Sequence, residues 1–199
     1  MQSLLQSICS IFHDIENYHN PLTNAHESRT GRLMSFLGSA LGFDRFTCDL
    51  LNNLGSIHDI GKIAIPVTIL EKRGPLTKFE RQVMELHPLI GYEFIKRIEH
   101  PDIELAKMVI LTHHENYDGS GYPKGLKGKE IPIEGSICSI CDVYDALRET
   151  RPYRKKKTHE EVFNMMYDSS PNGLYHKFNP KLMKYFEEMS DEIQVVYNQ

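Results

Sequence analysis

The chain has 199 residues and a formal net charge of -4, with 40% hydrophobic and 25% charged residues, which suits one globular domain. The weak negative charge argues against binding to DNA or RNA polymers, because such binding requires a basic face. No apolar run approaches the ~18 residues of a membrane span, and the first residues lack the features of a signal peptide, so a cytoplasmic location is expected.

Helices are the only regular elements that the hydrophobic pattern predicts. Apolar residues at helical spacing indicate a first helix over about residues 4–15, and a second from about 24 to 41 that a glycine closes. Asp44 can cap a third helix, which is expected to carry His58 and Asp59 at its end. No stretch alternates long enough to predict a strand, so the predicted fold class is all-α, a helical bundle in a single domain.

Capping signals mark the later helices. Thr77 and Glu80 form a capping box, and the helix that they open is expected to bring His87 to a position just before Pro88. A second box and an Asn-Pro pair predict helix starts further along the chain. The remaining predicted helices run from about residue 101 to 112, from about 134 to 147, after the box of Thr158 and Glu161, and from Asn179-Pro180 onward.

The four cysteines are too sparse for a disulfide framework in a chain of this length. Cys138 and Cys141 form a C-x-x-C, which has two interpretations. A zinc site would need a second cysteine pair and a redox pair would need a neighbouring strand, and the sequence shows neither. Two small apolar residues on a helix explain the spacing without any further feature. The second interpretation is favoured, and it agrees with a reducing compartment.

Histidine and aspartate residues form the most informative pattern. A single histidine is most simply an ordinary surface or core residue, but five of the ten lie on or at the ends of predicted helices and near another motif residue. Imidazole suits iron, manganese, nickel and zinc, and a carboxylate can bridge two cations. Paired metals ~3.5–4 Å apart lower the pKa of a shared water towards ~7, which makes a nucleophile without serine or cysteine. The candidate ligands are His26, His58, Asp59, His87, His113, His114 and Asp142.

A glycine-rich loop follows the paired histidines. Gly119 and Gly121 allow unusual backbone angles, and Pro123 restricts them. This would place the ring of Tyr122 for stacking on a nucleobase, whereas a tyrosine that only packs the loop would have the same sequence context.

The two histidine-containing pairs and the Gly-Tyr-Pro loop resemble the HD-GYP family of cyclic di-GMP phosphodiesterases, over about residues 23–188. The resemblance implies a helical bundle of the HD-domain type, with residues 21–199 as the catalytic domain. Residues 1–20 would form an N-terminal helix that serves as a linker or a dimerisation segment. Two shorter motifs carry the resemblance further: His26-Glu27-Ser28-Arg29 is similar to the family's H-x-x-R helix, and His87-Pro88 with Gly91 to its H-P-x-x-G segment.

The resemblance implies two metal ions. Family members with a third metal have a glutamate four residues before the helix histidine, where this chain has Leu22, so no third metal is expected. Iron or manganese is the expected metal, with nickel or zinc as alternatives, because no thiolate takes part. By the family motif, one metal is held by His26, His58, Asp59 and Asp142, and the other by Asp59, His87, His113 and His114.

The resemblance also implies contacts to substrate. Spacing alone would leave Lys62, Arg151 and Arg154 as solvated basic residues, but family members place basic side chains there against the substrate phosphate. Tyr122 would stack on a guanine, or would serve in docking to diguanylate cyclase domains. Asp145 would orient an arginine or a metal-bound water.

The predicted function is hydrolysis of cyclic di-GMP to linear pGpG, with further cleavage to GMP left open, by a water or hydroxide that bridges two metals. Asp59 and Lys62 are the predicted catalytic residues. Another cyclic dinucleotide, such as cyclic GMP-AMP, fits the same sequence. A binding module for cyclic dinucleotides or diguanylate cyclases is a rival from another class, against which the complete ligand set argues. A mononucleotide-cleaving HD enzyme would leave His87 and the Tyr122 loop unexplained, and the sequence leaves a homodimer and any regulatory input open.

Overall fold

The computed structural model describes residues 4–19, 24–149 and 156–199. All regular structure in these residues is helical and none of them forms a strand, so the predicted all-α fold class is confirmed. No helix among them combines the length and apolar character needed to cross a membrane. The helices are α1 (Leu4–His19), α2 (Asn24–Ala40), α3 (Arg45–Gly55), η1 (Ile60–Ala64), α4 (Val67–Leu70), α5 (Lys78–Met84), α6 (His87–Ile95), α7 (Pro101–Thr112), η2 (Gly128–Glu130), α8 (Ile133–Arg148), α9 (His159–Met166), η3 (Tyr175–Lys177), α10 (Pro180–Glu188) and α11 (Ser190–Tyr197).

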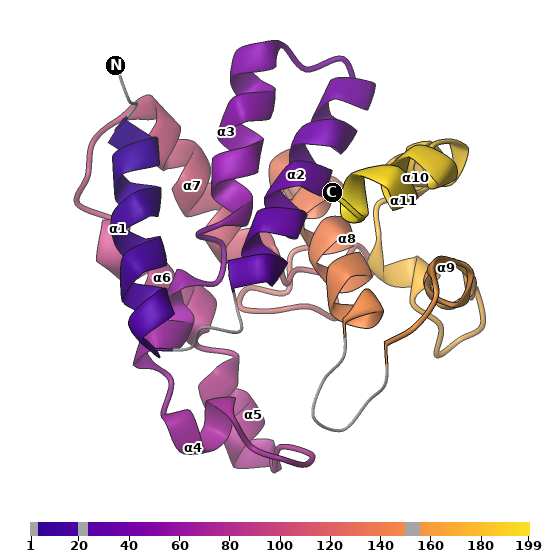
Figure 1. Ribbon diagram of the computed structural model, residues 1–199. Coiled ribbons are helices and arrows are strands. Elements are labelled where there is room, and N and C mark those ends of the chain that lie inside the picture. The colour runs from indigo at the N-terminus through magenta and orange to yellow at the C-terminus, as the bar shows by residue number, and fades with distance from the viewer. Residues whose placement is uncertain (1–3, 20–23, 150–155) are drawn as a thin grey trace.

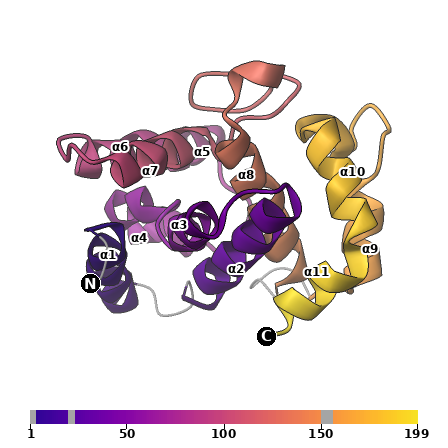
Figure 2. The same cartoon turned by 90° about the horizontal axis from the view of Figure 1, so that it is seen from above.

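The helices pack as a bundle (Figures 1 and 2). Helices α1, α3 and α2 stand side by side, and α6 and α7 pack together on one side of the bundle. Helices α9, α10 and α11 gather on the other side of α8, and α11 packs against α2. The short helices α4 and α5 project from one end (Figure 1).

The predicted helix starts are present, because polar side chains cap the first free backbone N–H groups. The Asp44 carboxylate accepts a hydrogen bond from the backbone N–H of Thr47 at 2.7 Å, at the start of α3. Thr77 and Glu80 exchange both hydrogen bonds of a capping box at α5. The other predicted caps are the box of Thr158 and Glu161 at α9 and the Asn179 cap of α10.

Helix α1 shares the core of the other helices. Leu5 is fully buried and Ile8 is buried beside it, within the same apolar cluster as the residues of α3 and α7. Helix α1 therefore packs as part of the bundle. The division of the chain into residues 1–20 and 21–199 stays a prediction.

The C-x-x-C cysteines are core residues. Cys138 and Cys141 lie fully buried as free thiols on α8. Burial raises the pKa of both thiols, because it disfavours the charged thiolate. The interpretation of this pair as small buried residues is confirmed.

Two glycines permit the helix contacts that bring the predicted site residues together. A side chain at Gly55, the last residue of α3, would overlap with the backbone of Gly31 on α2. A side chain at Gly61 in η1 would overlap with the carbonyl oxygen of His87 at the start of α6. Only residues without a Cβ allow backbones to approach so closely. These contacts set α2 against α3, and η1 against α6.

Three helix boundaries differ from the predictions. Helix α3 ends at Gly55, so His58 and Asp59 lie in the turn between α3 and η1 and are not on the helix. The helix opened by the capping box ends at Met84, and His87 begins α6, because a proline at the next position is compatible only with the first turn of a helix. The C-terminal helix is divided at Met189 into α10 and α11.

Candidate metal centre

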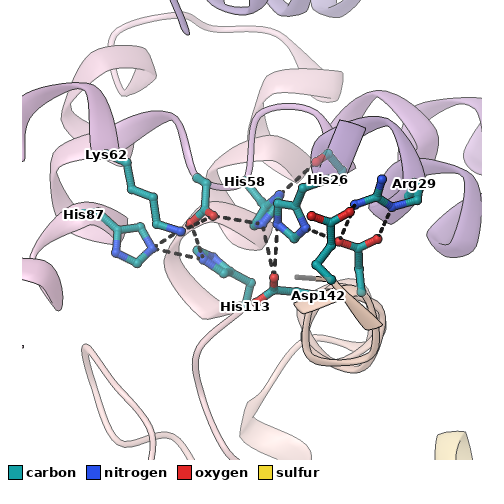
Figure 3. Close-up of polar contacts among 11 residues, drawn as sticks. His26, Arg29, His58, Lys62, His87, His113 and Asp142 are labelled. Atoms are coloured by element: carbon teal, nitrogen blue, oxygen red, sulfur yellow. Dashed lines mark hydrogen bonds and ion pairs between the residues drawn. The ribbon is translucent and has the colours of Figure 1, made fainter. Parts of the chain in front are cut away.

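The structure brings all seven predicted ligands together, in two adjacent groups within the bundle. Figure 3 labels His26, His58, His87, His113 and Asp142 among them. Within each group, one potential ligand atom from every residue lies within 4.8 Å of the others. The residues come from α2, the turn after α3, α6, the end of α7 and α8. The His26 group consists of His26, His58 and Asp142, and the His114 group consists of Asp59, His87, His113 and His114.

Three of the imidazoles are oriented by backbone carbonyl groups. A carbonyl oxygen only accepts hydrogen bonds, so the Nδ1 atom that faces it carries the proton and Nε2 keeps a lone pair. In each case the carbonyl belongs to the residue three positions earlier, so the orientation is set locally. The distances from Nδ1 to the carbonyl oxygen are 2.8 Å for His58 and Gly55, 2.8 Å for His87 and Met84, and 2.9 Å for His113 and Ile110.

Asp59 lies between the two groups. Its Oδ1 atom is 3.0 Å from Nε2 of His87 and 3.5 Å from Nε2 of His113, while Oδ2 is 3.4 Å from Nε2 of His58. The Lys62 ammonium group forms an ion pair with Oδ2. Burial favours the neutral acid, but the positive charge of Lys62 and the neighbouring imidazoles outweigh it and hold the pKa of Asp59 well below its ordinary value. Asp59 is therefore an anion with one oxygen directed to each group.

Several buried atoms in these groups lack a hydrogen-bond partner of the right kind. Nε2 of His58 and Oδ1 of Asp59 are buried without a hydrogen bond. Nε2 of His87 and Nε2 of His113 lie 3.2 Å apart, although both carry lone pairs when Nδ1 is protonated. Buried polar atoms are normally satisfied, and a divalent cation satisfies lone pairs of imidazole and carboxylate together. The residues therefore fit a divalent metal site.

The two groups differ in electrostatic character. For His26, burial opposes protonation, but hydrogen bonds to Asp142 and Asp145 outweigh it and raise the pKa to about 10. For His113, burial outweighs the attraction of the nearby Asp59 carboxylate and lowers the pKa to about 4. Burial and the neighbouring imidazole of His113 also lower the pKa of His114 well below its ordinary value. Carboxylates dominate the His26 group, and crowded imidazoles dominate the other.

An ionic network lies behind His26. Oδ2 of Asp145 is 2.6 Å from Nδ1 of His26, and the same carboxylate accepts two hydrogen bonds from Arg29, at 2.5 Å from Nε and 3.1 Å from Nη2. Arg29 also contacts the Glu149 carboxylate. Asp145 is fully buried, so this arrangement matches the predicted orientation of an arginine better than contact with a substrate. Arg29 was not among the predicted site residues, although it stands in the same motif as His26.

Tyr122 lies beside the His114 group. Its ring centroid is 4.7 Å from that of His114 and 6.2 Å from that of His87. Its backbone N–H donates to the carbonyl oxygen of His114 at 3.1 Å, which fixes the loop against the ligand. Tyr122 is therefore next to the ligand residues, and its contact with substrate stays a prediction.

Glu115 is a site-supporting residue that sequence reasoning missed. It is almost fully buried, and its carboxylate accepts hydrogen bonds from the backbone N–H groups of Lys124 and Leu126, at 2.7 and 2.9 Å. These bonds close the loop that carries Tyr122. Its position directly after the paired histidines was the available signal, but nothing in a linear sequence specifies which backbone groups a buried carboxylate will bind.

Three residues named in the sequence predictions, Leu22, Arg151 and Arg154, lie outside the residues that the structure describes. Their predicted roles stay predictions. Lys62, in contrast, is placed at the edge of the site, with 30% of its side chain exposed against 9% for Asp59.

The chain matches the HD domain family over residues 10–176, and therefore belongs to that family. HD-domain membership implies a divalent metal site, in agreement with the two ligand groups.

Relatives of known name confirm the resemblance to HD-GYP proteins. A cyclic di-GMP phosphodiesterase of Thermotoga maritima is 36% identical over 98% of this chain and 52% of its own length. The cyclic di-GMP phosphodiesterase response regulator RpfG of Xanthomonas campestris is 38% identical over 75% of this chain and 40% of its own. A 3'3'-cGAMP-specific phosphodiesterase 2 of Vibrio cholerae is 37% identical over 85% of this chain and 32% of its own. The chain thus spans about half the length of these relatives, or less.

Solved structures agree on the fold. The HD domain of the phosphodiesterase PgpH from L. monocytogenes superposes with a TM-score of 0.63 at 16% identity, covering 94% of this chain and 98% of that one. Bd1817, an HDG"Y"P protein from Bdellovibrio bacteriovorus, gives a TM-score of 0.62 at 20% identity, covering 85% of this chain and 54% of that one. The predicted helical bundle of the HD-domain type is confirmed.

Proposed function

We propose that this chain is a metal-dependent phosphodiesterase that hydrolyses cyclic di-GMP to linear pGpG. The observation that carries the proposal is the pair of ligand groups joined by Asp59, each with buried lone pairs directed inward. Relatives named as cyclic di-GMP phosphodiesterases supply the substrate class. Because the ligand set contains imidazole and carboxylate but no thiolate, we propose iron or manganese as the metal.

Two metals would be held by the two groups, with Asp59 shared between them. Bound there, divalent cations supply an activated water at neutral pH and neutralise charge on the phosphate oxygens. The residues of the chain provide the frame for this chemistry. The carbonyl-bound imidazoles keep Nε2 directed inward, and the buried Asp59 carboxylate stays ionised beside Lys62.

Lys62 is the proposed phosphate-binding group and proton donor. Its ammonium group contacts Asp59 on one side, and part of the side chain is exposed to solvent on the other. From this position it can donate a hydrogen bond to a phosphate oxygen. Attack of water on phosphorus breaks the bond to the 3′ oxygen. Lys62 supplies the proton that this leaving oxygen takes up, and the proton that the water loses passes to solvent, from which Lys62 is protonated again.

Tyr122 is the proposed contact for a nucleobase. Its ring already lies beside His114, so a base stacked on its other side would be held next to the phosphate that reacts. Arg151 and Arg154 are proposed as further phosphate contacts, on the resemblance of the sequence alone.

A mixed cyclic GMP-AMP is a second candidate substrate. The observation that favours it is the 37% identity to a 3'3'-cGAMP-specific phosphodiesterase, nearly the same as the identity to the cyclic di-GMP enzymes. Side-by-side turnover of cyclic di-GMP and cyclic GMP-AMP by one metal-loaded preparation distinguishes the two candidates.

The decisive experiment measures metal content and linear product together. Protein purified without oxygen and loaded with Mn²⁺ or Fe²⁺ is expected to convert cyclic di-GMP to pGpG. Asp59→Asn is expected to abolish this, whereas Asp49→Asn, which changes an exposed aspartate on α3, is the matched control and should retain full activity. Metal-loaded protein that binds cyclic di-GMP without forming product would instead be a binding module.

A further inference from the structure

The orientation of His26 depends on a different kind of contact from that of the other braced ligands. His58, His87 and His113 are held by carbonyl groups three residues earlier. His26 is held through Nδ1 by Asp145, which is 119 residues further along the chain. A carboxylate behind a metal-binding histidine fixes the ring and increases its basicity. Whatever positions Asp145 therefore controls the His26 group.

Arg29 positions Asp145. Its guanidinium group donates to both carboxylate oxygens, at 2.5 and 3.1 Å, while Oδ2 also faces His26. This two-point contact restrains the plane of the carboxylate, because the guanidinium fork is rigid. His26 and Arg29 both lie on α2, so the arginine and the histidine hold the Asp145 carboxylate of α8 between them.

The last helix covers this arginine. The Cζ atom of Arg29 lies 5.3 Å from the ring centroid of Tyr197, which is a buried residue at the end of α11. The Cζ atom of Arg148 lies 4.4 Å from the centroid of the same ring. An aromatic face attracts a cation, and the attraction is stronger where water is excluded. The Tyr197 ring thus contacts the guanidinium groups of Arg29 and Arg148. Of these, Arg29 orients Asp145, which in turn orients His26.

A second set of contacts fixes where Tyr197 lies. Arg148 donates to the Tyr144 hydroxyl at 2.9 Å, and this hydroxyl lies 2.7 Å from Nδ1 of His159. Nε2 of His159 lies 2.9 Å from the hydroxyl of Ser190, the first residue of α11. Helix α11 is therefore tied to α8 through α9, and it packs along α2 (Figure 2).

We propose that Tyr197 is a positioning residue for the metal bound by the His26 group, acting through Arg29 and Asp145. The chain of contacts runs from Tyr197 to Arg29, from Arg29 to Asp145, and from Asp145 to His26. No corresponding chain reaches the braced histidines of the His114 group within the described residues, since their Nδ1 atoms bind local carbonyls. The inference rests on metal binding as proposed above, and it is independent of the substrate.

Titration of metal-stripped protein with Mn²⁺ alone tests the proposal. We expect Tyr197→Leu, which removes the aromatic face, to weaken one of the two Mn²⁺ sites by about 10-fold and to leave the other unchanged. Tyr197→Phe keeps the ring and should restore wild-type affinity at both. Arg29→Lys, which leaves α11 intact but removes the two-point contact, should weaken the same site.

Phe186→Leu is the matched control for loss of packing. Phe186 is a buried aromatic residue on α10 that stacks on Phe163 and meets the ring of Tyr144 edge to face, whereas the ring over Arg29 is that of Tyr197. The control is expected to lower thermal stability while both Mn²⁺ affinities stay within about 2-fold of wild type. Equal weakening by Phe186→Leu and Tyr197→Leu, or unchanged binding by Tyr197→Leu, would overturn the proposal. Because no nucleotide is present, a wild-type protein that binds two Mn²⁺ ions but leaves cyclic di-GMP intact would contradict only the proposed function.

Discussion

The two metal groups are built on different structural principles. In the His114 group, the braced imidazoles His87 and His113 are oriented by carbonyls of the preceding helical turn. In the His26 group, His26 is oriented by a carboxylate on another helix. A local brace forms with the turn itself, whereas a tertiary brace forms only when α2, α8 and α11 are packed. One half of the site therefore depends on a contact between distant parts of the chain, whereas the braces of the other half are local.

The groups also respond differently to charge. Hydrogen bonds to the Asp142 and Asp145 carboxylates favour protonation of His26, while burial and neighbouring imidazoles oppose protonation of His113 and His114. A metal ion that binds the His26 group therefore displaces a proton from His26. A metal ion that binds the His114 group finds the Nε2 lone pair of His113 available without loss of a proton.

Removal of one ligand from each group is the largest expected perturbation. His58→Ala and His113→Ala should each reduce the Mn²⁺ content by one equivalent and lower turnover by about 10³-fold, because a single catalytic metal contributes several kcal/mol to the transition state. Elemental analysis and a product assay measure both effects. His176→Ala, which changes an exposed histidine, is the control. A ligand variant that retains two equivalents contradicts the assignment of its group.

Loss of the tertiary brace should affect only one group. In Asp145→Asn, the carboxylate that orients His26 loses its charge, so Mn²⁺ affinity at the His26 group should fall by about 10- to 100-fold while the other site is unchanged. Competition with a chelator measures the two affinities separately. Asp168→Asn, in an exposed turn, serves as the control. Parallel loss at both sites would show that the two groups are not independently supported.

The close contact of α2 and α3 is the next feature to change. Gly55→Ala places a methyl group against the backbone of Gly31, and overpacking of this kind destabilises a fold by about 1–3 kcal/mol. Gly74→Ala is matched to it, because a Cβ there meets no atom within 4 Å. Denaturant unfolding of the two variants is expected to separate them clearly. Equal stability would mean that the helices can shift apart without loss.

The smallest expected effect is a pH response of opposite sign in metal-stripped protein. The pKa of His26 is raised from 6.5 to about 10, so its contribution to stability is fully present below pH 6.5 and is lost as the pH rises to about 10. The pKa of His113 is lowered from 6.5 to about 4, so its contribution is present above pH 6.5 and is lost as the pH falls to about 4.

Thermal unfolding of His26→Gln and His113→Gln with a chelator measures this response. The stability difference from wild type should shrink towards high pH for His26→Gln and towards low pH for His113→Gln. Differences that shrink in the same direction for both variants would contradict the opposite electrostatic character of the two groups.

Much of the fold was predictable because its signals are local. Caps at Asp44, Thr77 and Thr158 depend on residues within one helical turn, and each lies where the sequence placed it. The third helix was expected to reach His58 and Asp59, but α3 ends at Gly55, whose backbone packs against Gly31 of α2, and no local signal specifies that contact between two helices.

The all-helical class, most helix starts and the set of residues that converge on the site could be predicted from the sequence, since capping and motif spacing are properties of short segments. The packing of the helices was needed to show that Asp59 directs one oxygen to each group and that Asp145 and Arg29 lie behind His26. The physical reason is distance along the chain: Arg29 and Asp145 are 116 residues apart, and no local preference of either residue specifies the other as its partner.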